Sequence, residues 1–305
     1  MLRKTTIASL ILLVALVSIT RAEQPWAKCT GFVGFVECLK KGCVAYDNHQ
    51  SVVVLNERGV VESTMKLQKG SYPAYVDSDG TLHFYKTKTS GEVSPRGEVT
   101  ESADYEIKMQ GSIPVGYGPG AYVTVYAPGL SLGMHAADRF SGVAVDPAGE
   151  TIAVVACPFN RTYVRIAKFV SEQWAWLESV PTPDIAMEGS GVLLLPGHND
   201  VRFIGPNRIA FLAQIDEPKV APKDVIDLTA TPIEGKATDK GMRPLYLLYC
   251  DLKTGFSRIK ARLRFARNGG ADYGNGLGSF TVSPDQKWLF LTTGDQIWRL
   301  SCEEG

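Results

Sequence analysis

Several features that define common protein classes are missing from this sequence, or nearly so. Amphipathic stretches with helical spacing are almost absent, which argues against folds in which long helices cover a sheet. There are only four histidines and no Cys-x-x-Cys pair, so neither a metal site nor another cofactor is expected. The 32 Lys+Arg balance the 32 Asp+Glu. In the most basic segment, 257–267, basic residues alternate with apolar ones, and the segment is interpreted as a strand with a basic outer face. Because the charges balance and this segment has a structural interpretation, nucleic acid is not expected as a partner.

Long apolar runs are absent beyond the N-terminus. Residues 1–22 combine Arg3 and Lys4 with the apolar run 7–19 and small residues up to Ala22, the arrangement of a secretory signal peptide. The run is shorter than the roughly 20 residues of a membrane-spanning helix, and an uncleaved signal anchor is the alternative. We expect a secreted, periplasmic or otherwise extracytoplasmic protein, with residues 23–305 as a single domain and no membrane span after signal removal. Residues 1–22 hold three basic residues and no acidic one, which leaves that domain a net charge of −3.

Cysteines are few but even in number. The six are Cys29, Cys38, Cys43, Cys157, Cys250 and Cys302. In an exported chain this number is typical of three disulfides, and the sequence does not choose among the roughly 15 pairings. If the two chain ends meet, Cys302 can bond one of the first three, a link worth about 4–5 kcal/mol in the chain-entropy model.

What the sequence has in abundance is period-2 apolar patterning bounded by Gly, Pro, Asn and Asp, which is typical of strands. Residues 245–249 are apolar throughout and predict a strand covered on both faces. One short helix is expected over residues 32–39. The predicted strands are 52–55, 82–85, 121–126, 151–156, 163–169, 209–212, 245–250 and 288–291.

A strand–turn–strand unit recurs four times along the chain. Each turn carries residues that reverse a chain, such as Asp79-Gly80 and Pro206-Asn207. Two further segments, 51–63 and 245–263, have the same order of strand, turn and strand, with longer polar turns. The four units are 73–85, 142–155, 200–213 and 279–293.

These units carry a resemblance to known repeats. Segment 282–300, VSPDQKWLFLTTGDQIWRL, resembles the repeat of TolB-type, WD-like propellers. Segment 76–93, VDSDGTLHFYKTKTSGEV, is similar to a quinoprotein-type repeat, and 51–61, SVVVLNERGVV, to an NHL-type repeat. The resemblance covers about half of the chain in scattered pieces and implies an all-β, irregular β-propeller of about six blades. A β-sandwich is the alternative.

Four short motifs suggest chemistry, but each has a simpler interpretation. Gly129–Gly133 matches a nucleophile elbow around Ser131, yet the strand–helix alternation of a hydrolase is missing. The Gly-rich segment 269–278 lacks the spacing of a phosphate-binding loop and is interpreted as a flexible loop. Asp77–Gly80 lacks the downstream Glu of a calcium loop and is interpreted as a turn. Asn160 lies in a glycosylation sequon that matters only in a eukaryotic host.

The candidate site comes from the register of the repeats. The residues that precede each first strand fall together when the units are aligned, and in a propeller they lie beside the central channel. Converging polar groups at such a mouth are typical of a binding site. If a metal or a general base were present, His135, Asp138, His198 and Asp200 would supply it. The candidate ligand-binding residues are His135, Asp138, Arg139, His198, Asn199, Asp200, Asp272, Tyr273 and Asn275.

Three functions fit this pattern. The first is a non-enzymatic binding module for a protein, glycan or small-molecule ligand outside the cytoplasm. The second is a propeller hydrolase, a metal-assisted lactonase or a glycan-cleaving enzyme, that uses Asp138, Asp200 and Asp272 at the channel. The third is a structural protein whose channel mouth is filled by Tyr72, Phe140 and Tyr273. We expect the first, because no catalytic constellation is recognisable.

Overall fold

The computed structural model describes 18 segments of the chain between residues 24 and 303. Every regular element in them is a strand, which confirms the all-β prediction. They contain no helix that is long and apolar enough to cross a membrane. The predicted signal peptide and Cys157 lie outside the described residues. The described segments are 24–31, 33–47, 51–66, 71–76, 81–86, 106–110, 113–118, 122–125, 140–156, 163–170, 173–176, 184–185, 192–193, 201–215, 226–229, 245–254, 256–264 and 279–303.

The first half of the chain forms three antiparallel sheets, each built from strands that follow one another. The first has the order β2-β3-β4-β5, the second pairs β6 with β7, and the third has the order β10-β9-β8. Their bounds are Val33–Cys38 (β2), Cys43–Asp47 (β3), Ser51–Leu55 (β4), Val61–Lys66 (β5), Ser71–Val76 (β6), Leu82–Lys86 (β7), Glu106–Gln110 (β8), Ile113–Gly118 (β9) and Tyr122–Val125 (β10).

The second half forms a fourth antiparallel sheet and a larger, mixed fifth one. The fourth has the order β11-β12-β13-β14, with bounds Phe140–Val145, Thr151–Ala156, Tyr163–Val170 and Gln173–Trp176. In the fifth, β17, β18, β20 and β21 pair antiparallel, β16 pairs with β18, and β15 and β19 pair parallel with β21. Their bounds are Asp184–Ile185 (β15), Val192–Leu193 (β16), Val201–Gly205 (β17), Arg208–Ile215 (β18), Ile226–Thr229 (β19), Leu245–Asp251 (β20) and Phe256–Arg264 (β21).

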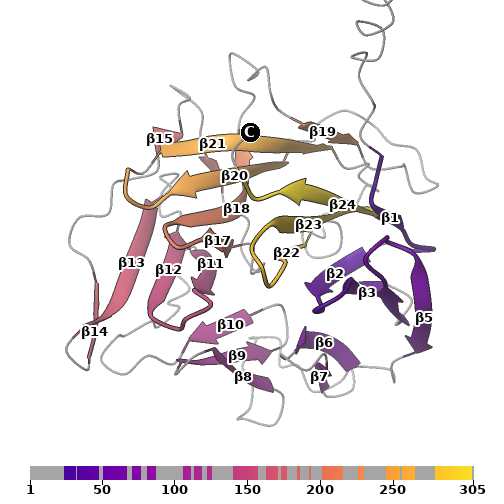
Figure 1. Cartoon of the computed structure of the whole chain (residues 1–305). Coiled ribbons are helices and arrows are strands. Elements are labelled where there is room, and N and C mark those ends of the chain that lie inside the picture. Colours follow the sequence, from indigo (N-terminus) through magenta and orange to yellow (C-terminus); the bar gives the residue numbers. More distant parts are fainter. Residues whose placement is uncertain are drawn as a thin grey trace, which may run out of the picture.

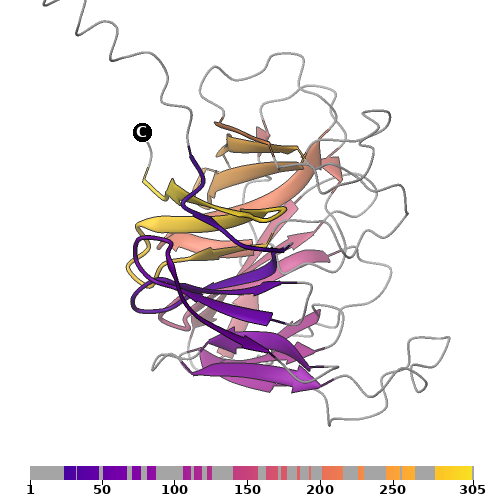
Figure 2. The ribbon, with the colours of Figure 1, turned by 90° about the vertical axis from the view of Figure 1, so that its right-hand side faces the viewer.

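The sixth sheet joins the two ends of the described chain. Its order is β1-β24-β23-β22, with bounds Ala27–Lys28, Gln296–Ser301, Trp288–Thr293 and Phe280–Val282. The N-terminal β1 pairs antiparallel with the C-terminal β24, and both views show the two strands side by side (Figures 1 and 2). The two ends of the described chain therefore meet in one sheet, which is the condition for a bond from Cys302 to one of the first three cysteines.

The six sheets stand in a closed ring (Figure 1). Strand β2 contacts β6 on one side and β22 on the other; β22 contacts β17, and β17 contacts β11. The ring closes through β10, which contacts β11, and through β9, which contacts β6. The first strands of the four predicted units, β6, β11, β17 and β22, therefore all lie at the inner edge of their sheets.

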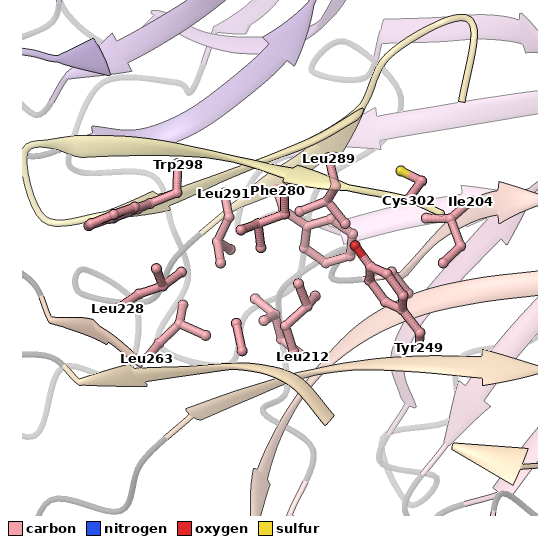
Figure 3. Close-up of a cluster of buried hydrophobic side chains, with 14 residues drawn as sticks. Ile204, Leu212, Leu228, Tyr249, Leu263, Phe280, Leu289, Leu291, Trp298 and Cys302 are labelled. Atoms are coloured by element: carbon pink, nitrogen blue, oxygen red, sulfur yellow. The ribbon is translucent and has the colours of Figure 1, made fainter. Parts of the chain in front are cut away.

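The core lies between neighbouring sheets instead of in one central mass. One apolar cluster joins the fifth and sixth sheets, where side chains of the two sheets face each other (Figure 3). A second joins the fourth and fifth sheets, and a third joins the sixth and first. A sheet in this position is buried on both faces, and a ring of such sheets is a β-propeller. The residues labelled in Figure 3 are Ile204, Leu212, Leu228, Tyr249, Leu263, Phe280, Leu289, Leu291, Trp298 and Cys302.

The eight strands predicted from the sequence are confirmed within the described residues. All eight predicted strands are present, and the four units are the hairpins β6–β7, β11–β12, β17–β18 and β22–β23. Strand β20 is covered on both faces, with Leu247 in one apolar cluster and Leu248 in another. The count of about six blades stays a prediction, since undescribed segments separate the small sheets β6–β7 and β8–β10.

The helix predicted over residues 32–39 is wrong, because Val33–Cys38 is strand β2. Gly34 is the extra residue of a bulge between the pairs Val33↔Asp47 and Phe35↔Tyr46. The bulge leaves Val33 and Val36 both buried, three positions apart. That spacing on its own is typical of a helix.

Candidate functional site

The ring has two faces, and the inner strands β2 and β22 begin on the same one. The N–H of Val33, at the start of β2, donates to the carbonyl oxygen of Gly294 at 2.8 Å. At the start of β22, the N–H of Ser279 donates to the hydroxyl of Thr292 at 2.8 Å. Both strands therefore begin beside the turn between β23 and β24. We call this the start face.

Strand β17 runs in the same direction as β22, because the turns that end the two strands meet on the opposite face. The N–H of Leu252, after β20, donates to the carbonyl oxygen of Asn207 in the turn after β17 (2.7 Å). The hydroxyl of Tyr249 donates to the carbonyl oxygen of Ser301 at the end of β24 (3.0 Å). The next residue, Cys302, donates its N–H to the carbonyl oxygen of Lys287 in the turn after β22 (2.9 Å). We call this the turn face.

Carboxylates shape the hairpins of the turn face. Asp251 accepts hydrogen bonds from the N–H groups of Lys253 and Thr254, both at 2.8 Å. Asp285 accepts from the hydroxyl of Ser283 and from a backbone N–H. These bonds lower the pKa of both carboxyl groups, the backbone bond from Thr254 contributing most at Asp251 and the Ser283 hydroxyl most at Asp285. The turn aspartates therefore hold local structure.

The predicted site residues lie outside the described residues, as do Ser131, Asn160 and the segments 77–80 and 269–278. The structure places the strands that follow them. Arg139 directly precedes β11, Asp200 directly precedes β17, and Asn275 stands five positions before β22. Strand β17 lies against both β11 and β22.

The inner strands themselves make polar contacts that were not predicted from the sequence. The hydroxyl of Thr281 in β22 donates to the Glu37 carboxylate of β2 at 2.8 Å, and Thr281 is almost fully buried. On the other side of β22, the guanidinium of Arg202 in β17 lies 6.0 Å from the centre of the Phe280 ring. Arg202 and Glu37 are each a charged residue within an otherwise apolar inner strand, a pattern that can be recognised in the sequence. Glu37 was not recognised in this way because residues 32–39 were predicted to be a helix.

The described segments contain no group of three or more His, Cys, Asp or Glu side chains that could hold a metal ion. Burial raises the pKa of Cys302 to about 12 and also raises that of Tyr249. Both groups are therefore neutral near pH 7 and belong to the core.

Comparison with known proteins gives no family. No family model matches the chain, and no curated protein matches it. Among solved structures, TolB from Agrobacterium tumefaciens is similar at 10% identity and a TM-score of 0.40, over 88% of this chain and 91% of that one. A gluconolactonase from Xanthomonas campestris is similar at 14% identity and a TM-score of 0.28, over 85% and 68%. The Dos1 propeller is similar at 9% identity and a TM-score of 0.37, over 89% and 78%. The fold assignment depends on the ring of sheets and not on these likenesses.

Proposed function

We propose that this protein is an exported, non-enzymatic binding module whose polar ligand sits at the start face of the ring. The observation that carries the proposal is the common direction of three inner strands, β2, β17 and β22, and the proposal extends this direction to β11, the neighbour of β17 in the ring. Strands β2 and β22 begin side by side, and β17 runs the same way next to β22. The residues that directly precede such strands are delivered to one face by chain connectivity alone.

Chain length limits how far the candidate residues can stand from that face. Asp200 is joined by a peptide bond to the first residue of β17, and Arg139 is joined in the same way to the first residue of β11. His198 and Asn275 are three and five positions before their strands, a reach of roughly 10–18 Å for a fully extended chain. Histidine, carboxylate, amide and guanidinium groups within such a radius match the hydrogen-bonding needs of a glycan or another polar ligand.

The test is a thermal melt of the full chain with a panel of oligosaccharides, aldonolactones and divalent cations, the last with an EDTA control. A ligand that binds only the folded state raises the melting temperature, by about 5 °C at a hundred-fold excess over its Kd. The site variant is His135→Ala/Asp138→Ala/His198→Ala. The matched control, Lys40→Ala/Lys253→Ala/Lys287→Ala, removes three exposed side chains from turns between strands.

We expect at least one sugar to stabilise the wild type and the control but not the site variant. A shift that survives equally in the site variant would place the ligand elsewhere and contradict the proposal. A lactone or glycan that is consumed during the experiment, with its turnover lost in the site variant, would make the protein the hydrolase described above. No shift with any ligand would reject a small polar ligand.

A further inference from the structure

The tip of the β2–β3 hairpin holds two cysteines opposite each other. Cys38 is the last residue of β2, Cys43 is the first of β3, and the two are direct partners in the register. Their sulfur atoms are 3.7 Å apart. Both residues are buried in the apolar cluster between the first and sixth sheets, together with Cys29.

The hydrogen bonds of the turn show whether Cys38 and Cys43 are a hydrogen-bonded or a non-hydrogen-bonded pair of the antiparallel ladder. The N–H of Leu39 donates to the carbonyl oxygen of Gly42 at 3.0 Å, which makes these two residues the hydrogen-bonded pair at the tip. Pairs alternate along an antiparallel ladder, so Cys38 and Cys43 form a non-hydrogen-bonded pair with Cα atoms about 4.5 Å apart. Disulfides span Cα separations of about 4.4–6.8 Å. Side-chain rotation can therefore bring the two sulfur atoms to bonding distance without moving the strands.

We propose that Cys38 and Cys43 form a disulfide across this hairpin when the protein folds in an oxidising medium. The oxidant is a small disulfide such as oxidised glutathione. One cysteine thiolate attacks it, forms a mixed disulfide and releases one glutathione thiolate. The second cysteine thiolate then attacks the protein sulfur of the mixed disulfide and releases the second glutathione. The protein loses two electrons and two protons, and one oxidised glutathione becomes two reduced ones.

The bond forms before the sheets close over the hairpin. In the folded ring, the hydrogen bond with Cys43 and burial both raise the pKa of Cys38, so the thiolate needed for exchange is scarce. During folding the hairpin is local, with four residues between the cysteines, and its thiols are still in water. The expected pairing is thus local. It differs from the link between the chain ends that the cysteine count alone left open.

The test uses the full chain, reduced and unfolded, then refolded in a glutathione buffer, blocked with iodoacetamide and cut with trypsin without reduction. Cleavage after Lys28, Lys40, Lys41 and Arg58 places Cys38 in peptide 29–40 and Cys43 in peptide 42–58. We expect a linked species, lighter by two hydrogen atoms than the sum of peptide 29–40, alkylated at its second cysteine, Cys29, and peptide 42–58, and reduction should separate the two. The link should persist in Cys29→Ala and in the matched control Cys302→Ala, and disappear in Cys38→Ser.

A second readout is the melting temperature with and without a reductant. A small closed loop is expected to add about 5 °C to the wild type, which the reductant removes, whereas Cys38→Ser should not respond. The proposal is overturned if peptide 42–58 is recovered alkylated from the folded wild type. It is equally overturned if that peptide is linked to Cys29, Cys157, Cys250 or Cys302.

Discussion

At the residue scale, two turns of the first sheet depend on positions that accept only glycine. Gly42 has φ +84°, and a Cβ there would lie 1.9 Å from the carbonyl oxygen of Leu55. Gly59 has φ +76°, and its Cβ would lie 2.1 Å from the carbonyl oxygen of Trp26. Each added methyl group meets backbone, which cannot rotate away. These glycines therefore fix how closely the hairpin β2–β3 approaches β4, and how closely the turn after β4 approaches the N-terminal segment.

Gly42→Ala is expected to destabilise the protein by more than about 1 kcal/mol, because it combines a left-handed backbone with a clash against Leu55. Urea unfolding of the two proteins measures the difference. Lys41→Ala, the neighbouring exposed position, serves as the control and should change little. An unchanged midpoint for Gly42→Ala would mean that the turn adopts another conformation.

The Cys302 thiol is expected to react with iodoacetamide at pH 8 at least roughly a hundred-fold more slowly than an exposed cysteine. Burial raises its pKa to about 12, so the neutral form predominates at that pH. Timed alkylation of the folded, reduced protein, followed on the tryptic peptide 300–305, measures the rate. Urea should bring the rate to that of a free thiol. Rapid labelling in the folded state would contradict its place in the core.

At the element scale, a bulge decides which faces of β21 are apolar. Leu248 pairs with Ile259 and Leu247 with Ala261, which leaves Lys260 as the extra residue. Ile259 consequently packs in the cluster between the fourth and fifth sheets, whereas Ala261 packs in the cluster on the other face of the sheet. The predicted strand with one basic face is therefore only partly right. The alternation is real, but the bulge distributes its apolar residues over two faces.

Deletion of Lys260 is expected to leave the protein folded, because it removes only the extra residue: Leu248 still pairs with Ile259 and Leu247 with Ala261, so the apolar side chains on both sides of the bulge keep their faces. Lys260→Ala keeps the bulge and should cost little, although it removes the contact of the ammonium group with the Tyr249 ring at 5.8 Å. Circular dichroism and melting curves of the two variants measure the difference. A deletion variant that fails to fold would show that the bulge itself is required, and not only the pairing on either side of it.

The turn after β22 is expected to make stability depend on pH. The Ser283 hydroxyl and a backbone N–H hold the pKa of Asp285 below its ordinary value of 3.8. A depressed carboxyl pKa contributes stability that is full above that ordinary value and is lost as the pH falls through the lower, folded-state pKa. Asp285→Asn should therefore melt below the wild type at pH 7, and the two should converge as the pH falls through the lowered, folded-state pKa of Asp285. A difference that stays constant over this range would exclude the charge as its cause.

At the scale of the whole molecule, the N-terminal segment closes the ring. Strand β1 supplies the outermost strand of the sixth sheet, and Trp26 packs edge-on against Phe290 with ring centres 4.7 Å apart. Lys28 adds an exposed ion pair with Asp295 at 3.4 Å, a contact that contributes little on its own. Closure of the last sheet by the other end of the chain ties the stability of the first sheet to that of the sixth.

A chain that starts at Cys29 is expected to melt about 5–10 °C below one that starts at Glu23, because it loses the pairing of β1 and the burial of Ala27 and Trp26. The shorter chain keeps Cys29 and its hydrogen bond to Asp295, so the comparison isolates the closing strand. Equal melting temperatures would show that the ring is closed by side-chain packing alone.

The sequence by itself determined the strands, the hairpins and the all-β class, because alternation along a strand and the residues of a tight turn are local properties. The apolar run 245–249 also determined that its strand is covered on both faces. Only the tertiary structure decided the bulges at Gly34 and Lys260. Each bulge sets which side chains face a neighbouring sheet, and these neighbouring sheets are distant in sequence. It alone also placed Glu37 and Arg202 on either side of β22. Which strands share a face of the ring, and therefore where a ligand can meet the residues that precede them, depends on contacts between sheets that no local pattern records.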